Sequence, residues 1–142
     1  MSSPPRIQKE LPMLCRRFGI EILYVFGSRA GELRCAIEAD GNLRPGGSSD
    51  VDLAVKMSQG QRLAIREKVN LAIALEDLLG VGKVDLVLLS EADPFLAVNI
   101  IRGERLYCVD EDGADDYDLY VLRRAGDLAR FERERIEKVL SR

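Results

Sequence analysis

The stretch that decides the fold is residues 20–56, which begins IEILYVFGS at 20–28 and ends SSDVDLAVK at 48–56. Residues 20–26 are almost continuously apolar, a pattern typical of a strand in the interior of a sheet. Gly27 and Ser28 follow this run directly. Residues 50–56 predict a second strand, and two carboxylates open it.

Asp50 and Asp52 are two residues apart, so on a strand their side chains project from the same face. Adjacent like charges repel and raise each other's pKa unless a positive charge lies between them. A divalent cation would satisfy both, and hard oxygen ligands favour magnesium or manganese. Gly27 permits a tight turn, and the amides after it can hold phosphate. Together these features indicate phosphoryl or nucleotidyl transfer.

A third carboxylate, Asp85, lies in the apolar run at residues 83–89, which predicts another strand. A lone buried carboxylate costs several kcal/mol unless it is paired or coordinated. We therefore expect Asp85 to join Asp50 and Asp52. The plainer interpretation is a solvated strand end, because two aspartates at this spacing are common in proteins.

Composition narrows the functional classes. The 142 residues fit one domain, with 46% apolar and 32% charged residues. A net charge of −3 argues against broad nonspecific DNA binding. The chain has no histidine, which excludes histidine general bases and histidine-ligated zinc. Three unpaired cysteines, no signal sequence and no membrane-length apolar run predict a cytoplasmic protein.

The remaining pattern alternates helices and strands, which predicts an α/β fold without repeats or a domain boundary. The expected further elements are a helix at 6–18 interrupted near Pro12, a helical turn at 29–34, loop or hairpin at 35–49, a helix at 61–79, a helix from about 93 to 102, a strand at 105–109 and a C-terminal helix at about 115–140. Apolar stripes are expected on two of these helices, and they are Leu63, Ile65, Val69, Ala72, Ile73, Leu75 and Leu79 on the first, and Tyr117, Val121, Ala125, Leu128, Phe131 and Val139 on the second.

Three motifs together resemble a known family. Gly-Ser at 27–28, S-D-x-D-L-x-V at 49–55 and V-D-L-V at 84–87 are similar to the minimal nucleotidyltransferases (MNT domains) of the polymerase-beta superfamily. Members of this type pair with HEPN-domain toxins as antitoxins. The resemblance covers residues 20 to about 107. It implies a single nucleotidyltransferase domain, with a core at about 20–109 and a small mixed sheet of about four strands with helices packed on it.

The resemblance also implies roles for individual residues. Asp50, Asp52 and Asp85 would be the catalytic carboxylates and magnesium ligands of a two-metal site, and Asp85 would activate the acceptor hydroxyl. Gly27, Ser28 and, more weakly, Ser49 would bind the triphosphate. The implied reaction transfers AMP from ATP to a hydroxyl, on a tyrosine of the partner HEPN toxin, and releases pyrophosphate.

The chain departs from the family at the segment between its motifs. About ten residues usually separate the Gly-Ser pair from the first aspartate, whereas residues 29–49 intervene here. The family motif G-S-x-A-R-G is replaced by G-S-R-A-G-E. Arg29 or Arg34 could supply the missing positive charge to phosphate, or could be a solvated surface residue. Both interpretations stand at this point.

Two other functions remain open. The chain could neutralise a toxin by occlusion without catalysis, or it could modify a small molecule as aminoglycoside nucleotidyltransferases do. The six acids between Asp110 and Asp118 predict a solvated start of a helix, or a surface that docks a basic partner. We expect no membrane association and no direct nucleic-acid partner, and a homo-oligomer is compatible with the sequence.

Overall fold

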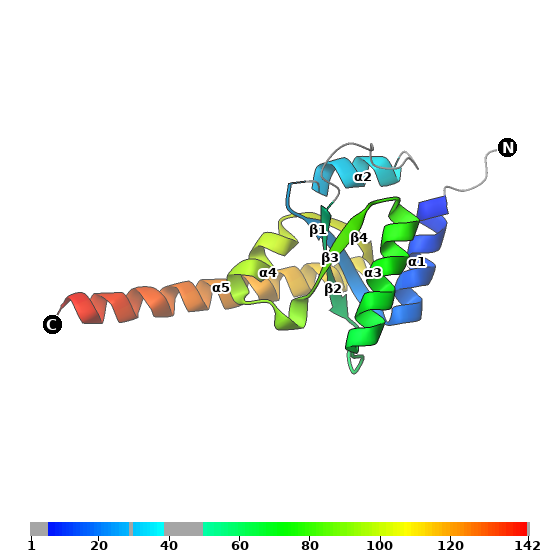
Figure 1. Cartoon of the computed structure of the whole chain (residues 1–142). Coiled ribbons are helices and arrows are strands. Elements are labelled where there is room, and N and C mark those ends of the chain that lie inside the picture. Colours follow the sequence, from blue (N-terminus) through cyan, green and yellow to red (C-terminus); the bar gives the residue numbers. More distant parts are fainter. Residues whose placement is uncertain (1–5, 29, 39–49, 142) are drawn as a thin grey trace.

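One mixed sheet forms the centre of the computed structural model, which describes residues 6–28, 30–38 and 50–141 (Figure 1). The strand order is β3-β2-β1-β4. The inner strand β1 is antiparallel to β2 and to β4, whereas β2 and β3 are parallel. The strands are β1 Ile20–Phe26, β2 Asp50–Met57, β3 Lys83–Leu88 and β4 Glu104–Cys108. The structure thus confirms the four-stranded mixed sheet and the interior position of β1.

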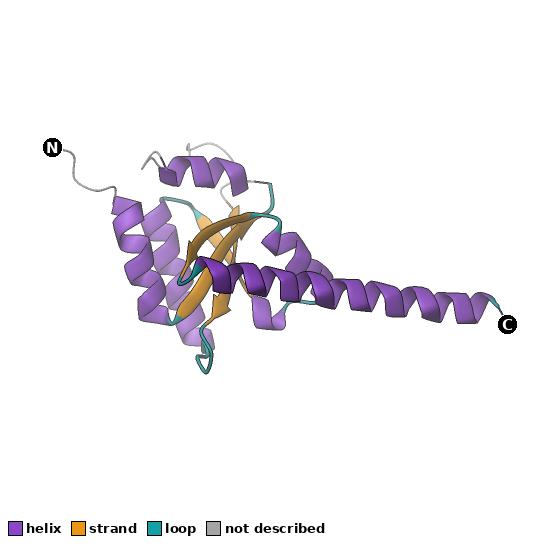
Figure 2. Cartoon of the chain, turned by 180° about the vertical axis from the view of Figure 1, so that it is seen from behind, coloured by secondary structure: helices purple, strands orange, loops and turns teal. Residues whose placement is uncertain are grey.

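Helices cover both faces of this sheet (Figure 2). Their bounds are α1 Arg6–Phe18, α2 Ala30–Glu38, α3 Ile65–Leu79, α4 Pro94–Ile101 and α5 Glu111–Leu140, with a 3-10 turn, η1, at Leu89–Glu91. One core lies between the sheet and α1, α2 and α3, and includes Val51, Leu53 and Val55 of β2. The second core lies between the opposite face and α4 and α5, and includes Tyr24 and Ala54. No helix in the described part of the chain is both long and apolar enough to cross a membrane.

Several expected element bounds were wrong. Helix α1 continues through Pro12, because Ile7, Leu11 and Cys15, on both sides of the proline, are buried against the sheet. Residues 35–38 extend α2 rather than forming a loop, and residues 39–49 lie outside the described residues. Residues 61–64 precede α3, which begins at Ile65.

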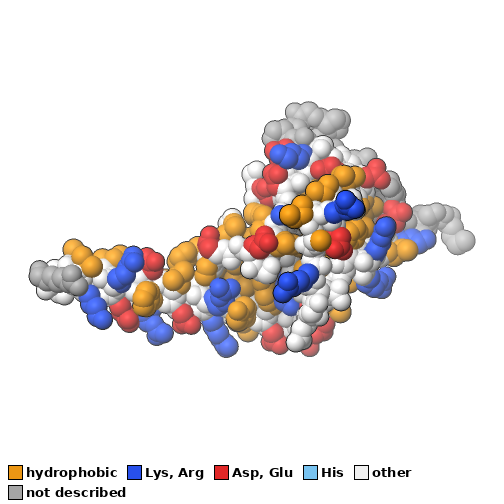
Figure 3. Space-filling view, turned by 60° about the horizontal axis from the view of Figure 1, so that its bottom comes forward, with side chains coloured by type: hydrophobic (Ala, Val, Ile, Leu, Met, Phe, Trp, Pro, Cys, Tyr) orange, Lys and Arg blue, Asp and Glu red, His pale blue; other side chains and the backbone are white. Residues whose placement is uncertain are grey.

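The predicted apolar stripes were only partly right. On α3 the buried row is Leu71, Leu75, Leu78 and Leu79. Ile65, Val69 and Ile73 are exposed instead. On α5, Val121 is buried, but Phe131 and Val139 are exposed, because the helix extends beyond the sheet (Figure 1). Figure 3 shows apolar and charged side chains together along this projecting half.

Candidate active site

Gly27 and Asp52 meet at one end of the sheet. The register places Phe26 opposite Asp52, so Gly27 follows directly beside the carboxylate. Gly27 has φ +83°, and a Cβ added there would lie 2.7 Å from Asp52 Oδ2. That separation is shorter than any normal contact, so only glycine leaves room for the carboxylate in this position. The structure therefore brings together the two motifs that the sequence singled out.

Asp85 lies on the other side of Asp52. The parallel register pairs these two residues across β2 and β3, so their side chains leave the sheet on the same face. Asp50 shares that face, since Val51 and Leu53 point into the opposite core. Burial raises the pKa of Asp52, and the carboxylates of Asp85 and Asp50 raise it further. The register thus places the three acids on one face of the sheet, with Asp52 between its register partners on β1 and β3.

The expectation that Asp85 is buried was wrong, because β3 is an edge strand of the sheet. The Asp85 side chain is 46% exposed, and Lys83 Nζ lies 3.6 Å from its Oδ1. Lys83 is also the register partner of Asp50. The sequence pattern did not single out this lysine beside the carboxylates. Its position two residues before Asp85, on the same face of a strand, was the available signal.

The described residues contain no group of three or more histidine, cysteine, aspartate or glutamate side chains that could hold a metal ion as they stand. Asp50 is exposed, and Asp85 is engaged with Lys83. The three aspartates therefore lie on neighbouring positions of β2 and β3, but their carboxylate groups do not converge on a single metal position. All of them are oxygen donors, the type that magnesium prefers.

The turn after β1 leads directly into a helix. Gly27 and Ser28 are exposed, and the Ala30 N–H donates to the Gly27 carbonyl at 3.3 Å. Helix α2 begins at Ala30, so its N-terminus, the positive end of the helix dipole, lies next to Gly27 and Ser28. Ser49 and Arg29 lie outside the described residues.

Arg34 forms an ion pair with Glu104 of β4, with 2.9 Å between Nη1 and Oε2. This contact places Arg34 on the surface beside the site. The side chain is 44% exposed, so the pair is screened by solvent and weak.

A cavity of about 300 Å³ adjoins Gly27. It is lined by Gly27, Ala30, Asn99, Arg102, Gly103 and Glu104. A Cβ at Gly103 would lie 2.2 Å from the Val25 carbonyl oxygen, so glycine lets the turn after α4 pass close to β1. No sequence pattern singled out Asn99 or Arg102. An amide and a guanidinium beside the turn at Gly27 are hydrogen-bond donors of the kind that can bind an anionic ligand.

Comparison with known families shows which family has this fold and these motifs. Residues 9–112 match the family described as polymerase beta, nucleotidyltransferase. The chain belongs to the polymerase beta nucleotidyltransferase family. The match includes the whole sheet and every carboxylate described above, which confirms the resemblance seen in the sequence. A comparison of this family member with curated proteins returns no match.

Solved structures share the fold of this nucleotidyltransferase. A chain of the MntA–HepT toxin–antitoxin has a TM-score of 0.62 at 19% identity, covering 94% of this chain and 97% of that one. A toxin–antitoxin with AMP-PNP scores 0.66 at 20% identity, with 94% and 98% coverage. The complex of tri-AMPylated Shewanella oneidensis HEPN toxin with MNT antitoxin scores 0.61 at 19% identity, with 94% and 96% coverage. At these identities the likeness establishes the fold alone.

Proposed function

We propose that this chain is an adenylyltransferase that transfers AMP from ATP to a hydroxyl group of a HEPN-type toxin, on a tyrosine, and thereby acts as its antitoxin. The observation that carries the proposal is the junction of Gly27, Asp52 and Asp85 at one end of the sheet. This junction combines a phosphate-binding turn with adjacent carboxylates, which is what nucleotidyl transfer requires.

Magnesium fits the carboxylates by their chemistry. Burial raises the pKa of Asp52, and the charges of Asp85 and Asp50 raise it further, so a divalent cation at this point would favour the charged carboxylate. Asp50 and Asp52 would hold the metal, together with Asp85. When bound, the metal would neutralise charge on the nucleotide phosphates.

The protein's own residues account for the rest of the reaction. The turn at Gly27 and Ser28 would bind phosphate oxygens through backbone amides, and Ser49 remains a candidate for the same role. Asp85 would accept the proton of the acceptor hydroxyl. The hydroxyl oxygen would then bond to the α-phosphorus as the bond to pyrophosphate breaks. Lys83, beside Asp50 and Asp85, would attract the phosphates.

Similar structures support the choice of acceptor and partner. One is a complex of a tri-AMPylated HEPN toxin with its MNT antitoxin, and another contains a toxin–antitoxin with AMP-PNP. The likeness extends over 94% of this chain and so includes much of α5. We assign the HEPN-type partner to the projecting half of α5, where Phe131, Ile136, Val139 and Leu140 are exposed. An apolar surface of this kind on an unsupported helix is typical of an interaction site.

Label transfer tests the reaction. The chain is incubated with the HEPN-domain protein encoded beside it, magnesium and ATP labelled at the α-phosphate. We expect label on the partner, and no label when Asp50→Asn and Asp52→Asn are combined. The matched control is Asp116→Asn, which neutralises an exposed carboxylate on α5 and should leave transfer intact. Transfer that persists in the double variant would refute the proposed site.

A second candidate is neutralisation by occlusion without catalysis. The exposed apolar residues of α5 favour it, because they suffice for binding a partner. The half-exposed Asp85, paired with Lys83, also favours it, because occlusion does not need this carboxylate. The same double variant separates the two functions. If the double variant no longer transfers label but still binds the toxin and suppresses its toxicity, occlusion is the operating mechanism.

A further inference from the structure

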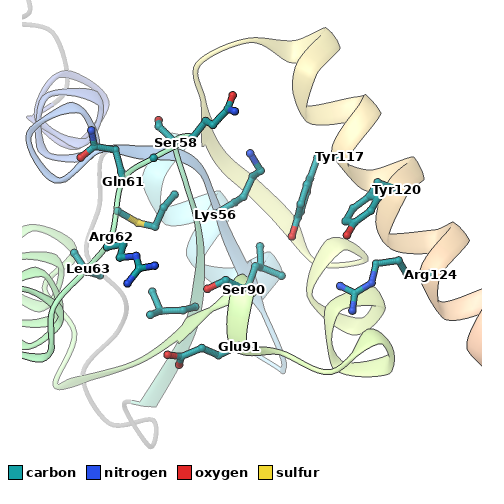
Figure 4. A pocket seen from close by; sticks show the side chains of 15 residues that line it. Lys56, Ser58, Gln61, Arg62, Leu63, Ser90, Glu91, Tyr117, Tyr120 and Arg124 are labelled. Carbon is teal, nitrogen blue, oxygen red and sulfur yellow. The ribbon is translucent and has the colours of Figure 1, made fainter.

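A cavity of about 720 Å³ lies at the end of the sheet away from the carboxylates (Figure 4). Strand β2 begins at Asp50 and ends at Met57, which lines this cavity. From Asp52 to Met57 the strand rises roughly 16 Å at about 3.3 Å per residue. The cavity lies beyond the carboxyl ends of the parallel strands β2 and β3, the usual place for ligands in open α/β sheets.

We call this cavity the α5 pocket. Its wall consists of the end of β2, the turn before α3, η1 after β3 and one side of α5. The lining residues used below are Lys56, Ser58, Gln61, Arg62, Tyr117, Tyr120 and Arg124. Its volume lies within the range of roughly 300–1,000 Å³ that small-molecule sites occupy.

One side of the α5 pocket is aromatic. The rings of Tyr117 and Tyr120 lie side by side on α5, with centroids 6.1 Å apart and planes 40° from parallel. Arg124 lies over the Tyr120 ring at 5.7 Å, and Lys56 lies over the Tyr117 ring at 5.3 Å. Burial raises the pKa of Tyr117 to about 12, so its phenol stays neutral at physiological pH. A planar base has a broad aromatic and cationic surface to stack on here.

The opposite side of the pocket is polar and positively charged. It presents Arg62 and Ser58, both from the turn between β2 and α3 (Figure 4). The Gln61 side chain, from the same turn, lies against Gly19 instead. Lys56 is paired with Glu21, but the described residues give neither Arg62 nor Arg124 a carboxylate within ion-pair distance. Glu91 is the acid on the rim. The pocket is therefore cationic in a protein whose net charge is −3.

We propose that the α5 pocket is a second nucleotide site, separate from the carboxylates, which binds a nucleoside monophosphate. The base stacks against Tyr117 and Tyr120, and the phosphate is held by Arg62 with Ser58. The aromatic side of the pocket offers rings on which a base can stack. The opposite side offers a guanidinium group, which binds phosphate through charge-assisted hydrogen bonds. The site does not depend on the proposed transfer reaction.

Binding of AMP to the full chain in EDTA tests the proposal, because removing divalent cations suppresses binding at the carboxylates. We expect saturable binding of AMP by calorimetry. Adenosine and inorganic phosphate should each bind roughly tenfold more weakly or worse, because each loses one of the two sets of contacts. Phosphate that binds as tightly as AMP would overturn the assignment, since the pocket would then recognise any small anion.

Two variants separate the phosphate side from the base side. Arg62→Gln should weaken AMP about tenfold and leave adenosine unchanged, because one charge-assisted contact is lost. Tyr120→Ala should weaken both ligands. The matched controls are Arg66→Gln, an exposed arginine of α3 outside the pocket, and Leu119→Ala, the exposed neighbour of Tyr120. Both controls should bind AMP as the unmodified chain does.

Three results would overturn the proposal. The first is no saturable AMP binding in EDTA by a chain whose thermal unfolding is normal. The second is full AMP binding by Arg62→Gln together with Tyr120→Ala. The third is loss of AMP binding in Asp50→Asn, which would place the nucleotide at the carboxylates instead.

Discussion

Gly27 is the residue whose replacement most directly tests the site. Gly27→Ala forces a Cβ against Asp52 Oδ2 and places alanine at φ +83°. We expect the free energy of unfolding to fall by about 1 kcal/mol, because alanine is disfavoured in a left-handed backbone conformation. Label transfer should be lost, because the Asp52 carboxylate must turn away.

Gly60→Ala is the matched control, since Gly60 has φ +81° and a Cβ added there would have nothing within 4 Å. It should lose similar stability and keep transfer. Equal transfer by the two variants would contradict the proposed role of Gly27.

Asp52 gives a prediction about pH and stability. Its pKa is raised by burial, Asp85 and Asp50, so the folded protein binds this proton more tightly than the unfolded chain. The corresponding stability is present below the ordinary pKa of 3.8 and is lost as pH rises through the higher folded pKa. Asp52→Asn should therefore stabilise the protein in EDTA at pH 7.5, by on the order of 0.5 kcal/mol. The gain should vanish near pH 3.5.

Denaturant unfolding at both pH values measures this difference, with Asp116→Asn as the control that should change little. Magnesium should raise the melting temperature of the unmodified chain and not that of Asp52→Asn. A variant less stable than the unmodified chain at neutral pH would mean that Asp52 is compensated by a partner rather than repelled.

At the scale of residues, the sequence predicted which face the carboxylates share and not what surrounds them. The spacing of Asp50 and Asp52 on a strand sufficed to place them on one face. Lys83 and Arg102 were not singled out because their positions near the carboxylates and Gly27 depend on strand register and on the turn after α4, which no local pattern indicates. Asp85 was expected to be buried because an edge strand and an interior strand can share the same apolar sequence.

At the scale of elements, α5 is held on the sheet by a charged network. Arg105 Nη2 donates to Asp118 Oδ2 at 2.8 Å, and the Tyr24 hydroxyl donates to Asp118 Oδ1 at 2.5 Å. Asp118→Ala removes both contacts and leaves Arg105, which is 19% exposed, with only the exposed carboxylates of Glu111 and Asp115 as partners. We expect a loss of about 2 kcal/mol in unfolding free energy, because bonds to a partly buried charge are involved.

The matched control for this network is Asp115→Ala. Asp115 also bonds Arg105, at 3.2 Å, but its side chain is 67% exposed. Its removal should cost about 0.5 kcal/mol or less. Chemical denaturation of the two variants measures the difference. Equal losses would show that solvent screens both contacts alike and that the network does not anchor the helix.

The helices show why periodicity alone misassigned the buried faces. Apolar residues on α3 occupy two adjacent rows, and only the tertiary position of α1 and the sheet decides which one is buried. Pro12 was expected to interrupt a helix because it removes a backbone donor. Burial of Ile7 and Cys15 on the two sides of the proline outweighs that loss. The start of α5 was set by Asp110, whose side chain accepts from the Gly113 N–H.

At the scale of the whole molecule, the two halves of α5 differ in how far they are buried. Its first half packs on the sheet through Val121, which is 2% exposed. Its second half projects from the body (Figure 1), and residues 131–141 are all exposed. An isolated helical segment of this length is marginal in water. We expect its amides to exchange rapidly in the free chain and to become protected when the HEPN-type partner binds.

Docking of the partner on this half of α5 leads to a sharp mutational prediction. Phe131 and Val139 lie eight residues apart, near one side of the helix, and are 63% and 61% exposed. Phe131→Glu combined with Val139→Glu should abolish co-purification with the HEPN-type protein, because burying the new charges in an apolar contact is costly. The unfolding midpoint of the chain alone should change little, since neither side chain is packed.

The equivalent change on α3, Ile65→Glu with Val69→Glu, introduces the same charges on exposed apolar residues and should leave partner binding intact. Loss of binding in the α3 variant with retention in the α5 variant would move the interface to α3. The projecting helix would then need another explanation.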